Sequence, residues 1–440
     1  MVAKLPEFVV PEEASKRGRI LKVDLRSPDF RIPEVLGQLS KMSPHIKETT
    51  IFLYPSLEQA KTLLDTRSPL SLEGVIRLDE CTTEIYSSNE IWLKYGSQFT
   101  DRKIRCFTHC SGRLADLKIT SVVQGLPQGS EVGSAWFVAN GCYALQLLAT
   151  PAEDEQLIAT RHKIERQPHR FELSGGAVAE ISRITARQSR KGEKETKKRA
   201  YAIQVESIKS AEKVNQDVSG LLILASLISR ERSDFGYWSV KEAGKPNIQN
   251  WRFGYSKWPK RPNGVEPLLR GEGNCRDFLS CALKHYQAAS DTSSLDSAVY
   301  ALLARDLPIE SNIVNLYTAT QRILTFALSL PTSNKMSISK LWAQFEKKYT
   351  IDLQDLWPLF GSKGSASLNE IRNVLVHGRA FTAASDFKAL SIATENLRWT
   401  LERILLAILG WDIELSTVSA KKLNWLTAHN WKEPQKSLTL

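Results

Sequence analysis

The sequence predicts an α+β protein, in which a β-rich antiparallel N-terminal domain precedes an all-α helical bundle. Two observations carry this prediction. Residues 1–215 hold short segments rich in β-branched and aromatic residues, separated by Gly, Pro and Ser. From about residue 275, apolar residues recur every three or four positions, which is the period of an amphipathic helix. We therefore expect three parts, at residues 1–215, 216–274 (a mixed connector) and 275–440.

Composition narrows the class of protein. The 440 residues are 42% hydrophobic and 24% charged, which is ordinary for globular domains. The six cysteines include no CxxC pair, so a disulfide framework is not expected. The charged N-terminus does not fit a signal peptide, and no apolar run approaches the roughly 20 residues of a membrane-spanning helix. We expect a cytoplasmic protein with no membrane partner.

The first 215 residues read as strands. The segments are 18–25, 49–55, 74–80, 91–96, 134–150, 170–185 and 199–207. Their short length and the turn residues between them favour an antiparallel sandwich or barrel-like sheet over a βαβ repeat. Residues 180–185 and 200–207 flank a charged stretch, which predicts a long hairpin with a basic tip.

The positive charge is concentrated in the middle of the chain. With 59 Lys+Arg against 48 Asp+Glu the net charge is +11, and residues 161–274 contribute +10 of it (23 against 13). Basic residues interleaved with aromatics suit RNA, because cations meet phosphates and rings stack on bases. The same stretches also fit a solvated hairpin tip at 188–198 and a packed interdomain loop at 251–262. The candidate RNA-binding residues are Arg187, Arg190, Lys191, Lys197, Lys198, Arg199, Trp251, Arg252, Lys257 and Trp258.

The C-terminal part reads as successive helices, after an apolar helical segment at 216–230. We expect helices within 275–290, 295–306, 311–329, 337–349 and 385–410. Two of them carry an apolar stripe that predicts the bundle-facing side. The stripes are Ile313, Leu316, Thr320, Ile323, Leu324 and Ala327 in one helix, and Phe387, Leu390, Thr394, Leu397, Leu401, Ile404 and Ile408 in the other.

A short helix between these two has well-marked ends. Ser367 and Glu370 have the spacing of a capping box, and Gly378 is a typical stop, so we expect a helix over 368–377. At about 100° per residue, two faces separate. Leu368, Ile371, Val374 and Leu375 form the expected core face, and Arg372, Asn373, Val376 and His377 lie opposite.

Arg, Asn and His on one face support the cleavage of a phosphodiester bond in RNA. A histidine titrates near neutrality and can move a 2′-hydroxyl proton or protonate the leaving oxygen. An arginine presents a fork of donors to the phosphate, and an asparagine can orient the His or hold the phosphate. Acid and base together need two such groups, which a two-fold dimer would supply.

The string from Arg372 to His377, with Asn373 directly after the Arg, resembles the R-x(4–6)-H motif of HEPN-domain ribonucleases. The resemblance implies a HEPN-like bundle at 275–440, a homodimer with a composite site, and metal-independent endoribonuclease activity. Carried over, the catalytic residues are Arg372, Asn373 and His377, with no cofactor and no metal.

A mostly β N-terminal half before such a bundle is similar to ApeA-like abortive-infection proteins. That resemblance implies an antiviral toxin that cleaves cellular RNA, with transfer RNA as one candidate substrate. It also implies that residues 1–215 sense a phage-derived trigger or restrain the nuclease. The alternatives are a non-catalytic HEPN dimer that binds nucleotide or RNA, and a His377 that only caps a buried contact.

Overall fold

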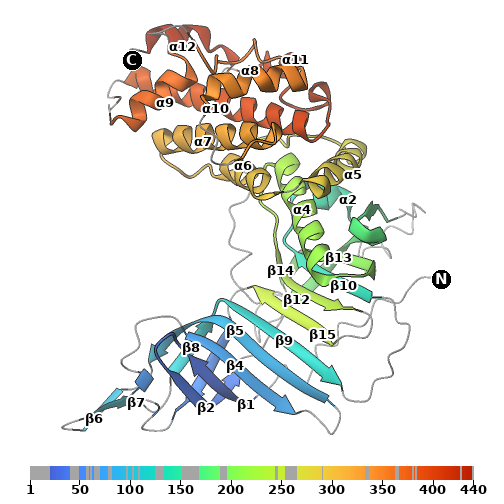
Figure 1. Ribbon diagram of the computed structural model, residues 1–440, viewed down its shortest axis with the longest axis vertical. Coiled ribbons are helices and arrows are strands. Elements are labelled where there is room, and N and C mark those ends of the chain that lie inside the picture. The colour runs from blue at the N-terminus through green and yellow to red at the C-terminus, as the bar shows by residue number, and fades with distance from the viewer. Residues whose placement is uncertain are drawn as a thin grey trace. The chain divides into compact units, whose positions relative to one another are not determined.

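A computed structural model of the chain shows strands in the N-terminal half and mostly helices in the C-terminal half (Figure 1). The coarse α+β prediction is confirmed. The residues that the structure describes are 20–39, 49–55, 59, 62–63, 70–77, 82–95, 98–101, 104–107, 110–123, 133–150, 168–188, 196–242, 246–252, 265–289, 291–331, 336–361, 366–378, 381, 384–426 and 429–438.

The chain forms two compact units, each assembled from separate segments. The first unit comprises 1–141, 149–216 and 234–258, and the second comprises 142–148, 217–233 and 259–440. These bounds differ from the three expected parts, because the stretch 216–274 does not form a piece of its own. Residues 217–233 belong with the helices, whereas 234–258 belong with the strands.

The described part of the first unit is built on a sheet of 13 strands, all joined in antiparallel pairs. Their order across the sheet is β11-β12-β13-β10-β14-β15-β9-β5-β4-β1-β2-β3-β8. The strands are β1 (Ile20–Arg26), β2 (Arg31–Leu39), β3 (Thr49–Tyr54), β4 (Leu70–Arg77), β5 (Thr82–Tyr95), β8 (Cys110–Leu114), β9 (Asp116–Val123), β10 (Gly133–Ala139), β11 (Arg170–Glu172), β12 (Val178–Gln188), β13 (Thr196–Ile208), β14 (Phe235–Lys241) and β15 (Asn247–Arg252), with a separate pair β6 (Gln98–Asp101) and β7 (Ile104–Phe107).

One end of this sheet closes on itself, because β8 pairs with both β3 and β5. The closed ring of six strands encloses an apolar core. Val23, Leu25, Ile51 and Leu53 are fully buried there, as is Tyr86. Alternate residues of each strand point to opposite faces, so the odd positions in β1 and β3 supply the inside of the ring.

The predicted long hairpin is present as β12 and β13, which pair from Val178↔Glu206 to Gln188↔Thr196. Two further strands, β14 and β15, come from the stretch that we expected to be connector. β14 pairs with β10, and β15 pairs with β9, so both lie inside the sheet rather than between domains.

The second unit is helical. Its helices are α2 (Tyr143–Leu148), the part of α4 (Ala211–Ser229) from residue 217, α5 (Glu272–Ala288), α6 (Ser293–Leu303), α7 (Ile309–Ala327), α8 (Ile338–Tyr349), α9 (Leu368–Val376), α10 (Ala384–Ile408), α11 (Ala420–Leu423) and α12 (Lys432–Ser437). Helix α7 packs against α6, α8, α9 and α10 (Figure 1). None of the described helices is long and apolar enough to cross a bilayer.

The apolar stripes predict most of this packing. All six stripe residues of α7 are buried, as expected. In α10 the stripe is buried from Leu390 to Ile408, but Phe387 is 44% exposed, so its predicted burial is wrong. Phe387 lies in the first turn of a 25-residue helix. Neighbouring helices need not reach that far, and a periodic pattern carries no information about where they end.

The second part of α4 is buried around its circumference, as a helix that is apolar on all sides should be. Val218, Leu221, Leu222, Leu224 and Ile228 are each at most 2% exposed. Its C-terminal end is tied to other segments of the same unit. Ser229 Oγ accepts a hydrogen bond from the Ala144 amide (2.9 Å), and the Ile228 carbonyl accepts one from the Leu268 amide (2.7 Å).

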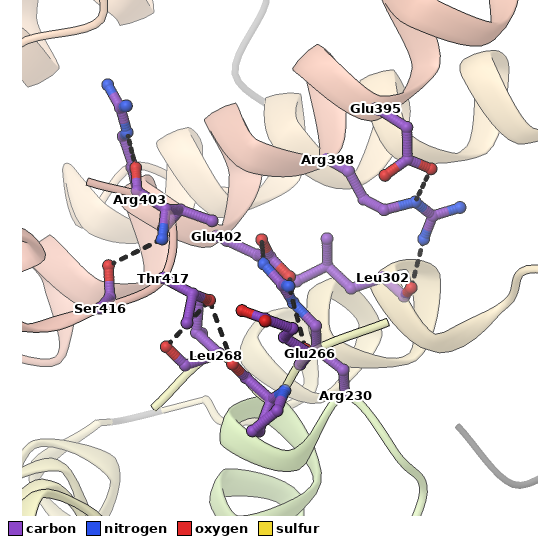
Figure 2. A network of polar contacts seen from close by, with 12 residues as sticks. Arg230, Glu266, Leu268, Leu302, Glu395, Arg398, Glu402, Arg403, Ser416 and Thr417 are labelled. Carbon is purple, nitrogen blue, oxygen red and sulfur yellow. Dashed lines mark hydrogen bonds and ion pairs between the residues drawn. The ribbon is translucent and has the colours of Figure 1, made fainter. Parts of the chain in front are cut away.

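Charged side chains of α10 are also buried and paired (Figure 2). Glu402 accepts two hydrogen bonds from Arg230, at 2.7 and 2.6 Å. Arg398 donates to the Leu302 carbonyl and lies 3.5 Å from Glu395. Burial lowers the pKa of the Arg398 guanidinium to about 10, and the nearby charge of Arg305 adds to this. These pairs fix α10 in the unit because a buried charge needs a partner.

Candidate active site

The motif helix α9 begins at a firmly held point. Ser367 is 1% exposed, and its Oγ accepts a hydrogen bond from the Glu370 amide at 3.3 Å, so the predicted N-cap is confirmed. The next two amides donate to carbonyls of the preceding turn, Leu368 to Pro358 and Asn369 to Leu359, both at 3.0 Å. The amides of a first helical turn have no partner within the helix, so these bonds anchor α9.

The carbonyl just before the cap is held as well. The Ala366 carbonyl accepts a hydrogen bond from the Trp357 ring nitrogen at 2.5 Å and one from the side-chain amide of Gln435 at 3.3 Å. Trp357 is 1% exposed, and its own backbone amide donates to Asn396 of α10. The start of α9 is therefore fixed to a buried tryptophan and, through it, to the central helix.

The helix ends at Val376, one residue earlier than we expected. His377 is the C-cap, with φ −84° and ψ 8°, and Gly378 follows at φ +79°. The His377 amide donates to the Asn373 carbonyl (3.0 Å), and the Gly378 amide donates to the Leu375 carbonyl (3.1 Å). Left-handed backbone favours glycine, so Gly378 ends the helix and leaves the His377 side chain exposed at its last turn.

The faces of α9 match the prediction in the first turn and depart from it afterwards. Leu368 and Ile371 are fully buried, as expected. Val374 and Leu375 are only half-buried, and Val376 is 48% exposed. The helix thus enters the core at its N-terminal end and emerges from it toward His377.

Two of the three predicted catalytic residues are in direct contact. Arg372 Nη1 donates a hydrogen bond to Asn373 Oδ1 at 3.1 Å. Both side chains are half-buried. This bond occupies the amide oxygen of Asn373, so in this structure Asn373 orients the arginine. Arg372 Nε is buried and has no hydrogen-bond partner within the described part of the chain.

A tyrosine that the motif does not contain completes the group. The Arg372 guanidinium carbon lies 5.9 Å from the centre of the Tyr317 ring, within cation–π range. The Tyr317 hydroxyl donates to Asn369 Oδ1 at 2.6 Å. Burial raises the pKa of Tyr317, and the Arg372 charge opposes that rise, so the phenol stays protonated and acts as a donor at neutral pH.

The sequence offers only a weak signal for these two additional residues. Asn369 precedes Asn373 by four positions, so both belong to the same row of the helix. Tyr317 adjoins the apolar stripe of α7 and reads as a core residue. Its contact with α9 joins elements about fifty residues apart, which no local pattern reveals.

Six of the ten candidate RNA-binding residues are described by the structure, and these lie in the other unit. Arg187, Lys197, Lys198 and Arg199 are in the β12–β13 hairpin, where Arg187 is opposite Lys197 in the register. Trp251 and Arg252 end β15, opposite Leu117 and Asp116 of β9. Arg190, Lys191, Lys257 and Trp258 lie outside the described residues. Their role in RNA binding stays a prediction.

Among the described residues, no group of three or more His, Cys, Asp or Glu side chains could hold a metal ion. The side chains that α9 presents are the exposed imidazole of His377 and, one turn earlier, the Arg372 guanidinium that is bonded to Asn373. Comparisons of the chain with protein-family models, with characterised proteins and with solved structures found no match.

Proposed function

We propose that the protein is a metal-independent endoribonuclease of HEPN type, acting in the cytoplasm, with Arg372, Asn373 and His377 as its catalytic set. The observation that carries the proposal is the arrangement on α9. Arg372 and Asn373 are hydrogen-bonded to each other, and the exposed His377 caps the same helix one turn further on. Asn373 and His377 are four residues apart, so their side chains are on one face.

In the proposed reaction the 2′-hydroxyl of RNA attacks the adjacent phosphorus. His377 takes the hydroxyl proton or protonates the leaving 5′-oxygen, since an imidazole can act as a general base or a general acid. Arg372 stabilises the charge that grows on the phosphate oxygens, because a guanidinium fork matches their geometry. The products are a 2′,3′-cyclic phosphate and a 5′-hydroxyl. Asn373 keeps the Arg372 fork in place through the bond between them.

The proposed site needs a second copy of the chain. One α9 supplies one imidazole, whereas proton removal and proton donation require two groups. A two-fold dimer places the same surface of both protomers face to face and so brings two copies of His377 together. The 48% exposed Val376, next to His377, gives that surface an apolar residue to bury.

The proposed biological role rests on the order of the two parts, a β-rich half before a helical one, which is similar to ApeA-like abortive-infection proteins. We propose an antiviral toxin that acts in abortive infection and cleaves cellular RNA, transfer RNA among it. The β-rich unit senses a phage-derived trigger or restrains the nuclease. The excess positive charge of residues 161–274, which precede the expected bundle at 275–440 in the sequence, would capture the RNA backbone.

The test is incubation of the purified full-length protein with total RNA in EDTA. Wild type should cleave, and His377→Ala and Arg372→Ala should each lose at least about a hundredfold in rate. His285→Ala is the matched control, because His285 is also exposed on a helix of the same unit and should leave cleavage unchanged. Equal cleavage by wild type and His377→Ala would rule the proposal out.

A non-catalytic dimer that binds nucleotide or RNA is the second candidate. The separation of charge from motif favours it, since the net charge of residues 275–440 is only +3 (18 against 15). RNA binding that weakens steeply with salt, without new RNA ends, would establish this function in place of cleavage.

A further inference from the structure

Tyr317 makes two separate contacts with the motif helix from the middle of α7. The residue is 2% exposed. Its hydroxyl donates to Asn369 Oδ1 at 2.6 Å, and its ring faces the Arg372 guanidinium at 5.9 Å. A buried leucine would also be apolar, but it would provide neither the hydrogen bond nor the aromatic face.

These contacts connect Tyr317 to both Asn369 and Arg372, and Arg372 to Asn373. Tyr317 holds Asn369, its ring supports Arg372, and Arg372 in turn donates to Asn373. The guanidinium is thus restrained by a ring on one face and by an amide at one edge. A free arginine side chain samples many rotamers, and an oriented fork loses less entropy when it meets a phosphate.

We infer that Tyr317, together with Asn369, is a positioning residue, which holds the Arg372 guanidinium in the orientation that meets the scissile phosphate. The inference rests on the proposed function, because it assigns a role in that same site. Tyr317 itself touches no substrate. Its hydroxyl is committed to Asn369, and burial keeps it protonated.

The helical unit contains a matched control. Tyr286 of α5 is also 2% exposed, and its hydroxyl donates to Asp296 Oδ1 at 3.0 Å. Tyr286→Phe therefore removes the hydroxyl of a buried tyrosine, as Tyr317→Phe does, but the hydroxyl partners of Tyr286, Thr292 and Asp296, are at the start of α6 rather than in α9. A general loss of stability would affect both variants alike.

The first arm of the test measures RNA cleavage. Tyr317→Phe keeps the ring and should lower kcat about threefold to tenfold, the worth of one net hydrogen bond. Asn369→Ala should have the same effect, and the double variant should be no slower than either single one, because both remove the same bond. Tyr317→Leu also loses the ring and should lower kcat further. Tyr286→Phe should keep the kcat of wild type.

The second arm does not depend on activity. The Nε–H signal of Arg372 is measured by 15N NMR and assigned by its absence in Arg372→Lys. Tyr317→Leu should speed exchange of this proton with water at least tenfold, whereas Tyr286→Phe should not. Should Tyr317→Leu fail to fold, Tyr317→Phe with Asn369→Ala replaces it.

Unchanged exchange, or equal losses of kcat in the two Phe variants, would overturn the inference. If wild type cuts no RNA, the proposed function fails, and the exchange rates alone decide whether Tyr317 orders Arg372.

Discussion

The ion pair between Arg230 and Glu402 gives a sharp test of the helical unit. Arg230 follows the last turn of α4, and Glu402 lies in α10 (Figure 2). Two parallel hydrogen bonds join them at 2.7 and 2.6 Å, and the side chains are 11% and 2% exposed. Glu402→Gln keeps the shape of the side chain and removes its charge. Among the hydrogen-bond partners described for Arg230, Glu402 provides the one carboxylate, so the nearly buried guanidinium loses its counter-charge.

The expected cost follows from this burial. Removing one partner of a buried ion pair costs about 3–5 kcal/mol, because the remaining charge stays out of water. The glutamine oxygen still accepts one hydrogen bond, and Arg230 Nη1 still donates to the Glu266 carbonyl at 3.1 Å. We therefore expect about 3 kcal/mol. In a unit of about 200 residues, this lowers Tm by roughly 6–12 °C.

The assay is urea denaturation of the full chain with fluorescence and thermal scans, in parallel for a matched control. Arg276 and Asp277 are paired at a similar distance, 2.8 Å, but their side chains are 49% and 56% exposed. Asp277→Asn should cost less than about 1 kcal/mol. Replacing both Arg230 and Glu402 by methionine should be less harmful than Glu402→Gln alone. A Glu402→Gln protein as stable as Asp277→Asn would refute the burial argument, and with it the assignment of residues 217–233 to the helical unit.

Three further substitutions test other parts of this unit. Burial raises the pKa of Asp355, but hydrogen bonds from Arg403 (2.6 and 2.7 Å) outweigh this effect and hold the pKa below its ordinary value. The stability that this carboxylate provides is complete above the ordinary range near pH 4 and is lost as the pH falls below it, so acid titrations of unfolding should be steeper below about pH 4 in wild type than in Asp355→Asn. Ser367→Ala should cost about 1 kcal/mol in denaturant titrations. Ser367→Gly should cost only about a few tenths of a kcal/mol, since glycine is also accepted at the N-cap and adds no volume to this buried position; equal losses would contradict the cap. Gly220→Ala should cost about 1–3 kcal/mol, because its Cβ would collide with the Tyr286 ring, and a neutral result would show that α4 and α5 are less closely packed.

Features set by local patterns could be predicted from the sequence. The Ser367 cap, the Gly378 stop and the buried stripe of α7 each depend on residues within one helix. The β12–β13 hairpin depends on two adjacent strands, and its register begins and ends close to the expected segments. In these cases the spacing of apolar, capping and turn residues determines the structure directly.

Features set by distant partners could not. The stretch 216–274 contains strands whose neighbours, β9 and β10, are more than ninety residues away in the sequence. Its mixed local pattern therefore predicts a connector, although two of its segments are strands of the sheet. The all-round apolar surface of residues 218–228 was the available signal that this helix is buried. In the candidate site, the contact of Arg372 with Asn373 is local, whereas the support from Tyr317 depends on how α7 and α9 pack.

The measurement that tests the central claim most directly is the end chemistry of RNA cut by the full-length protein in EDTA. We expect fragments that carry a 2′,3′-cyclic phosphate and a 5′-hydroxyl, because the 2′-hydroxyl is the nucleophile in the proposed reaction. These ends should disappear in His377→Ala and persist in His285→Ala. Fragments with a 3′-hydroxyl and a 5′-phosphate, or cyclic ends that persist without His377, would contradict the proposed mechanism.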